Sequence, residues 1–135
     1  KDILFILKSK DYNWTKLQVF QKDLKKLENL QNVELFDQNL KWGNHKIIDA
    51  FDFAIGKYTS IIDYFLIRNK PVILYENPIT IEIFTNYGSK VFAYSVNDIK
   101  MKIKSLKKNY YNYNKRLNII RKKLYYKFDN RKFII

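Results

Sequence analysis

The sequence predicts an α/β protein, a Rossmann-like three-layer sandwich whose central sheet has five parallel strands. Short apolar runs alternate along the chain with amphipathic segments, which is typical of βαβ units. Connections of this kind are right-handed crossovers, so neighbouring strands run parallel. The 135 residues are 47% hydrophobic and contain no cysteine, so the chain can bury one domain-sized core without disulfides.

The predicted elements follow one another in a regular order. The strands are expected at residues 3–7, 33–36, 53–56, 72–75 and 91–94. Helices are expected between them at residues 14–30, 45–52 and 80–87, and a further one, the third in order, carries Ile61, Ile62, Phe65 and Leu66. Asn44 is predicted to cap the second helix and Thr59 or Ser60 the third, because short polar side chains accept hydrogen bonds from first-turn N–H groups. Asn69-Lys70-Pro71 ends the third helix, and Gly88 ends the fourth.

Residues 95–135 form a basic C-terminal segment that differs from the core of residues 1–94. The core holds 13 Lys/Arg and 11 Asp/Glu, whereas the C-terminal segment holds 13 Lys/Arg and 2 Asp/Glu. Apolar or aromatic side chains recur there every three or four residues, at Ile99, Ile103, Leu106, Tyr110, Tyr113, Leu117, Ile120 and Leu124. This spacing fits one long helix, but we expect two helices, broken near Lys108-Asn109, that pack on the same domain.

The net charge of +13 has three interpretations. Basic and aromatic residues at 108–127 fit single-stranded nucleic acid, and lysines on an outward helix face fit an anionic membrane surface. The third interpretation is A/T-rich codon usage. Lys, Ile, Asn and Tyr, which A/T-rich codons encode, make up 65 of the 135 residues. No apolar run reaches the roughly 18 residues of a membrane span. The chain begins at Lys1 in a strand-like run, and we expect it to be a piece of a longer protein.

Polar side chains follow several predicted strands, at the edge of a parallel sheet where ligands bind. Lys57, Thr59 and Ser60 come after the third strand, and Lys8 follows the first. Gly56 is interpreted as the residue that lets the backbone turn and approach a ligand. Because helix N-termini and ammonium groups attract anions, Lys8, Lys57, Thr59 and Ser60 are the predicted phosphate-binding residues. The alternative is that Thr59 and Ser60 only cap the helix.

Two carboxylates are the predicted binding groups for ribose or sugar hydroxyls. Asp63 lies in the first turn of the third helix, and Glu76 follows the fourth strand. A carboxylate can accept two hydroxyl bonds, although Asp63 also suits a solvated position beside the helix dipole. His45, the one histidine, is interpreted as a surface or capping residue, and no catalytic residue is assigned. A multi-histidine metal site is excluded, as are dinucleotide sites of the G-x-G-x-x-G type and P-loops.

Residues 45–76 combine a short helix, an acid, a hydrophobic strand, a Thr-Ser turn, an acid three residues on, and a Lys-Pro-Val-Ile strand. The residues of this pattern are Asp52, Thr59, Ser60, Asp63, Lys70, Pro71, Val72 and Ile73. The segment resembles the donor-binding, C-terminal half of GT-B glycosyltransferases of bacterial surface or capsular polysaccharide synthesis. It also resembles the related teichoic-acid glycerophosphotransferases. Residues 125–130, Tyr-Tyr-Lys-Phe-Asp-Asn, are similar to the terminal segment of such proteins.

The resemblance implies a nucleotide-activated donor as substrate, with no separate cofactor and no metal. Thr59 and Ser60 would contact the donor phosphate, and Asp63 its ribose or sugar hydroxyls. The glycerophosphotransferases usually carry an acid before the turn and His-Pro after the first strand, where this chain has Lys57-Tyr58 and Lys8-Ser9-Lys10. These departures favour a nucleotide sugar over a polyol phosphate donor.

The same resemblance places the acceptor site and any catalytic base in a missing N-terminal Rossmann-like domain, so the chain is expected to be inactive alone. It implies a cytoplasmic enzyme that is peripheral at the inner face of the membrane. Two alternatives stay open from the sequence. One is a nucleotide-sugar 2-epimerase of the same fold, and the other is a basic nucleic-acid-binding module.

Overall fold

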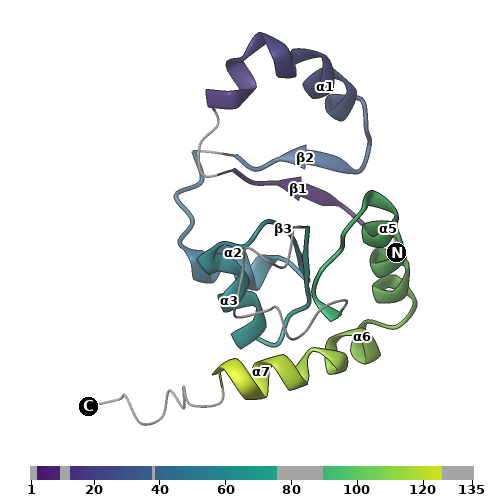
Figure 1. Cartoon of the computed structure of the whole chain (residues 1–135). Coiled ribbons are helices and arrows are strands. Elements are labelled where there is room, and N and C mark those ends of the chain that lie inside the picture. The colour runs from purple at the N-terminus through teal and green to yellow at the C-terminus, as the bar shows by residue number, and fades with distance from the viewer. Residues whose placement is uncertain (1–2, 10–12, 38, 76–89, 126–135) are drawn as a thin grey trace. The chain divides into compact units, whose positions relative to one another are not determined.

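The computed structural model describes residues 3–9, 13–37, 39–75 and 90–125, and the chain divides into two compact units, residues 1–41 and 42–135. Helices and parallel strands alternate within it, so the α/β class is confirmed (Figure 1). The described strands form two separate two-stranded sheets, one in each unit. The predicted helix at 80–87 and its cap Gly88 lie outside the described residues.

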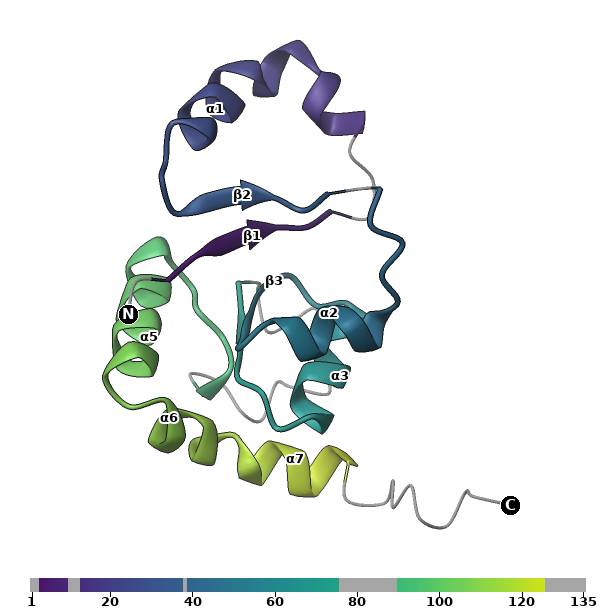
Figure 2. The ribbon, with the colours of Figure 1, turned by 180° about the vertical axis from the view of Figure 1, so that it is seen from behind.

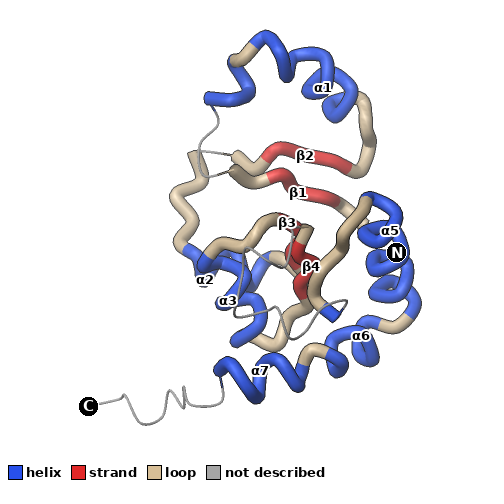
Figure 3. Tube along the Cα trace, in the orientation of Figure 1, coloured by secondary structure: helices blue, strands red, loops and turns tan. Residues whose placement is uncertain are grey.

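The first unit is a single βαβ element. Strand β1 (Phe5–Leu7) is followed by a 3-10 turn (Asn13–Lys16), helix α1 (Gln18–Glu28) and strand β2 (Val33–Leu35). The two strands, red in Figure 3, lie side by side and are parallel. Phe5 is opposite Val33, and Leu7 is opposite Leu35. Leu24 of α1 is buried, and so is Phe36 just after β2. The expected strand–helix–strand order is confirmed here, with shorter elements.

The second unit begins with two αβ pairs. Helix α2 (Asn44–Ala50) precedes strand β3 (Ala54–Gly56), and helix α3 (Ser60–Ile67) connects β3 to strand β4 (Val72–Leu74). Strands β3 and β4 are parallel, with Ala54 opposite Val72 and Gly56 opposite Leu74. The prediction that Asn44 caps α2 is wrong. The N-cap is Gly43, whose extended backbone already turns the chain into the helix at Asn44.

The expected fifth strand is present only as a short parallel contact. Phe92 forms an isolated parallel bridge with Leu74, and the Leu74 N–H donates to the Val91 carbonyl at 2.9 Å. The Ala93 N–H donates to the Leu74 carbonyl at 2.8 Å. The parallel direction of this segment therefore agrees with the prediction. Its extent does not, because one bridge replaces the four-residue strand expected at 91–94.

The described part of the basic C-terminal segment, residues 95–125, contains three helices rather than one or two. Helices α5 (Val96–Lys108), α6 (Tyr110–Arg116) and α7 (Asn118–Tyr125) follow one another around the second unit (Figure 2). The predicted break at Asn109 is confirmed, and its side chain caps α6 by accepting from the Asn112 N–H at 2.9 Å. A second break falls at Leu117, whose N–H donates to the Asn114 carbonyl at 3.0 Å. None of the described helices is long and apolar enough to cross a membrane.

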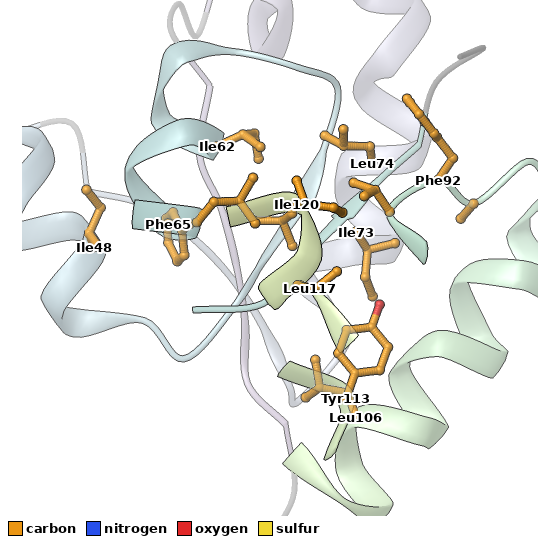
Figure 4. Packing of buried hydrophobic residues seen from close by; sticks show 14 residues of the cluster. Ile48, Ile62, Phe65, Ile73, Leu74, Phe92, Leu106, Tyr113, Leu117 and Ile120 are labelled. Carbon is orange, nitrogen blue, oxygen red and sulfur yellow. The ribbon is translucent and has the colours of Figure 1, made fainter. Parts of the chain in front are cut away.

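The core of the second unit confirms that the apolar seam of the C-terminal helices is a packing surface. Figure 4 shows Leu106, Tyr113, Leu117 and Ile120 among side chains of α2, α3 and β4. Ile99, Ile103 and Leu124 pack against the same cluster while partly buried. All three residues of β4 are fully buried, as expected for a strand covered on both faces. This covering holds the start of α3 at the end of β3.

Helix α3 ends in a motif that the Asn69-Lys70-Pro71 sequence makes possible. Asn69 adopts a left-handed conformation with φ 58°, which asparagine tolerates better than most residues. The Asn69 N–H donates to the Leu66 carbonyl at 3.0 Å, and the Lys70 N–H donates to the Phe65 carbonyl at 2.8 Å. This pair of bonds is a Schellman motif, and Pro71 then starts the path into β4. The predicted stop of the helix is confirmed.

Candidate functional site

The candidate site lies where β3 ends and α3 begins. After Gly56, the last residue of β3, come Lys57 and Tyr58, and then Thr59 as the N-cap of α3. The Thr59 backbone is extended (φ −148°, ψ 162°), and its carbonyl accepts from the Ile62 N–H at 2.9 Å. Thr59 and Ser60 are exposed. The structure therefore places two hydroxyl side chains at the positive end of a helix dipole, directly after a parallel strand.

The Thr59 side chain makes no capping hydrogen bond to the helix. A hydroxyl at the N-cap ordinarily accepts from an N–H of the first turn, which would account for its presence by helix stability alone. That account does not apply to Thr59 in this structure. The Thr59 hydroxyl therefore does not perform the capping role that the alternative interpretation assigned to it.

Gly56 has a different role from the one predicted from the sequence. Its backbone does not adopt the positive φ that would require glycine, and a Cβ built on it meets nothing within 4 Å. Its carbonyl accepts a strand-extending bond from the Tyr75 N–H at 3.0 Å. The prediction that the backbone turns sharply at Gly56 is therefore wrong. The open space beside its Cα still allows another molecule to approach the backbone closely.

Asp63 is held by a tyrosine that sequence reasoning did not assign to the site. The Tyr58 hydroxyl donates to Asp63 Oδ2 at 2.7 Å, and both side chains are half-buried. Burial, together with the bond to the Asp63 carboxylate and its charge, raises the pKa of Tyr58 to about 12. Tyr58 therefore stays a neutral donor at physiological pH. No pattern in the sequence marks this pair, because the contact depends on how the loop turns into α3.

The remaining predicted binding residues are Lys57, Lys8 and Glu76. Lys57 is exposed in the β3–α3 loop beside Tyr58 and Thr59. Lys8 belongs to the first unit, where its ammonium lies 5.8 Å from the centroid of the Phe36 ring. Glu76 lies outside the described residues. The described part of the site therefore consists of Lys57, Thr59, Ser60 and the Asp63 carboxylate held by Tyr58.

His45 contributes to packing between two helices. Its ring lies edge-on to that of Tyr64, with 6.2 Å between centroids, and so joins the start of α2 to the exposed side of α3. This contact agrees with its interpretation as a surface residue. Within the described ranges, no group of three His, Asp or Glu side chains is placed to hold a metal ion.

Lys70 has a structural role, although it is one of the residues of the pattern noted at residues 45–76. Its ammonium donates to the carbonyls of Ile48, Asp49 and Phe51, the last two at 3.2 and 2.7 Å. These carbonyls lie at the C-terminal end of α2. Carbonyls at a helix C-terminus have no intrahelical donor, and the negative end of the helix dipole there favours a cation. Lys70 thereby ties the C-terminus of α2 to the end of α3.

Arg121 of α7 also binds backbone carbonyls rather than a ligand. Its Nε donates to the Leu66 carbonyl at 2.9 Å, and its Nη2 donates to the Lys70 carbonyl at 3.1 Å. The guanidinium also binds Asn114, whose amide nitrogen donates to the Asn69 carbonyl at 2.6 Å. Burial lowers the pKa of Arg121 to about 10, so it remains a cation at neutral pH. Lys70 and Arg121 thus hold the helices around the site and do not belong to it.

Together these features define a parallel α/β protein with a strand–loop–helix edge suited to an anionic ligand. No protein-family model matches the chain, and neither a curated protein nor a solved structure matches it.

Proposed function

We propose that this chain is the nucleotide-sugar-binding domain of a GT-B glycosyltransferase that builds a bacterial surface polysaccharide. The observation that carries the proposal is the start of α3. Exposed Thr59 and Ser60 follow a parallel strand, and Asp63 lies one turn further on, held by Tyr58. The hydroxyls at the start of the helix can bind an anionic phosphate group. The neighbouring carboxylate can bind a group that carries several hydroxyls.

The phosphate would lie at the N-terminus of α3. The N–H groups at the start of a helix have no intrahelical acceptor, and the dipole there favours negative charge. The hydroxyls of Thr59 and Ser60 can donate to phosphate oxygens, and exposed Lys57 adds a positive charge. When the donor bond breaks, the same groups would stabilise the leaving diphosphate without a metal ion.

The donor's ribose or sugar would meet Asp63. An ionised carboxylate offers about four acceptor positions, so a carboxylate that accepts from Tyr58 can also accept from ligand hydroxyls. That bond also holds the carboxylate in one orientation, which lowers the entropy lost when a ligand binds. Tyr58 is therefore a positioning residue in this proposal.

The proposal extends to the sheet and to the whole enzyme. The parallel pairs β1–β2 and β3–β4, together with residues 91–94, would belong to one five-stranded sheet. The acceptor substrate and the catalytic base would be bound by a separate N-terminal domain. The enzyme would work in the cytoplasm, beside the inner face of the membrane.

The test is binding of UDP-, CDP-, CMP- and GDP-linked sugars to the full chain, measured by ligand-detected NMR and calorimetry. For the donor that binds, Ser60→Ala and Asp63→Ala should each weaken the Kd about ten- to a hundredfold, since a hydrogen bond to a charged group contributes roughly 1.5–3 kcal/mol. Asp49→Ala is the matched control, because Asp49 is an exposed acid on neighbouring α2.

Three outcomes decide the matter, with circular dichroism used to show that each variant folds. Weaker binding in the two site variants and unchanged binding in the control support the proposal. Unchanged binding in all three variants would contradict it and leave Ser60 and Asp63 with structural roles only. Failure of all donors to bind the folded chain would contradict it as well.

A further inference from the structure

Helix α5 presents four lysines on one exposed face. Lys100, Lys104 and Lys108 follow one another at intervals of four residues, and Lys107 lies beside them on the same side. All four are exposed. Residues four apart on a helix are neighbours, so these lysines form a continuous positive strip about two turns long.

The orientation of this strip is determined by the opposite side of α5. Leu106 is buried in the core of the second unit, and Ile99 and Ile103 pack against that core. The Ser95 hydroxyl accepts from the Asp98 N–H at 3.1 Å and caps the start of the helix. Because the apolar side is anchored, the lysine side cannot turn inward, and its charge is displayed as a surface.

The next two helices extend the positive surface. Lys115 and Arg116 are exposed at the end of α6, and Lys122 and Lys123 are exposed on α7. Across residues 96–125 there are ten Lys/Arg and one acid, Asp98. Asp98 itself accepts from the Tyr94 N–H at 3.0 Å, at the very start of α5. Within these three helices, Asp98 is therefore the one acid among the described residues.

Apolar side chains lie among these lysines. Met101 and Val96 are exposed on α5, at 58% and 59%, and Ile119 is exposed on α7. Tyr111, at the start of α6, is 73% exposed. Lysines interleaved with exposed aliphatic and tyrosine side chains match the two layers of a lipid headgroup region, where cations meet anionic headgroups and apolar tips reach the acyl boundary.

We propose that the exposed face of α5–α7 docks on an anionic lipid surface. This inference does not depend on the proposed donor site. Single-stranded nucleic acid fits less well because it needs several aromatic stacking platforms. Tyr113 is buried, and the Tyr110 hydroxyl donates to the Asp52 carbonyl at 3.0 Å, so Tyr111 is the tyrosine of α6 that remains well exposed.

The test is partitioning of the full chain onto vesicles of phosphatidylcholine alone and of phosphatidylcholine mixed with phosphatidylglycerol. The key variant is Lys100→Gln/Lys104→Gln/Lys108→Gln, which keeps good helix formers while it removes three charges from the strip. The matched control is Lys16→Gln/Lys22→Gln/Lys25→Gln, which removes three exposed lysines from the first unit. Both variants have the same net charge.

The wild-type chain should bind the anionic vesicles, release from them as salt rises, and ignore the neutral ones. A lysine near such a surface contributes about fivefold to partitioning, so the α5 variant should lose about a hundredfold and the control much less. Equal losses in both variants would overturn the proposal, since net charge alone would then explain binding. Equal recovery on neutral and anionic vesicles would also overturn it, as would tighter binding of single-stranded DNA that persists at moderate salt.

Discussion

Replacing Arg121 by methionine should destabilise the second unit strongly, because one guanidinium joins α7 to the ends of α3 and α6. Its donors reach the carbonyls of Leu66, Lys70 and Asn114, and the side-chain oxygens of Asn114 and Asn118. Methionine preserves most of the aliphatic volume and removes every donor. The change therefore tests the hydrogen bonds and leaves the packing of α7 largely intact.

The magnitude follows from the three backbone carbonyls. A buried acceptor that loses its donor costs about 1–3 kcal/mol, and water can replace part of that because Arg121 is only half-buried. We expect the free energy of unfolding to fall by about 3 kcal/mol. For a domain of this size, that is a decrease in Tm of roughly 10–15 °C. Against a total stability of about 5–15 kcal/mol, the variant should still fold at low temperature.

The assay is urea unfolding followed by circular dichroism, with two companion variants. Arg116→Met changes an exposed arginine of α6 and should cost less than about 0.5 kcal/mol. Arg121→Lys keeps the charge but places it on a single nitrogen, so it should recover less than half of the loss. If Arg121→Met cost no more than Arg116→Met, or if lysine restored full stability, the bonding network would not stabilise the fold as reasoned here.

Four further predictions concern single side chains. Tyr113→Phe should raise the free energy of unfolding, measured by urea titration, by about 1 kcal/mol. The reason is that the buried Tyr113 hydroxyl has no hydrogen-bond partner among the described residues. A lower free energy of unfolding in the variant would show that the hydroxyl is hydrogen-bonded. Lys70→Met should cost about 1–2 kcal/mol in the same measurement by exposing the end of α2, and a neutral result would contradict the capping role. The pKa of Tyr58 and that of Tyr113 are both raised to about 12 by burial, so the folded state holds these protons more tightly than the unfolded state. The stability that these two tyrosines contribute should therefore be complete below pH 10 and be lost as pH rises toward 12. Arg121, whose pKa is lowered to about 10, acts in the opposite direction over this interval and offsets part of the loss, so a net decline is expected and a net rise would refute the assignment. Gly56→Ala should leave the Tm unchanged or slightly higher, because a Cβ there has space, and should weaken donor binding if phosphate approaches this backbone; unchanged Kd would place the donor elsewhere.

The local pattern of the chain was enough to predict most of the described elements. Strands β1 to β4 and the seam through Leu106, Leu117 and Ile120 follow from apolar periodicity. Periodicity is a property of neighbouring residues, and burial of an apolar face is the largest energy that a segment gains on folding. The same pattern predicted too long a strand at residues 91–94. The length of a strand depends on the neighbouring strand that pairs with it, and in the described residues this segment forms one bridge, to Leu74.

The polar contacts were decided by the tertiary structure alone. Thr59, Ser60 and Asp63 could be named from the sequence, but the bond from Tyr58 that orients Asp63 could not. Lys70 matched a family pattern and caps α2 instead, and Arg121 binds carbonyls 51 and 55 residues away in the chain. Every residue carries the same backbone carbonyl, so the sequence contains no mark of which one a distant cation will bind. Only the packing of α2, α3 and α7 brings those carbonyls within reach of Lys70 and Arg121. That packing gives these two cations a structural role.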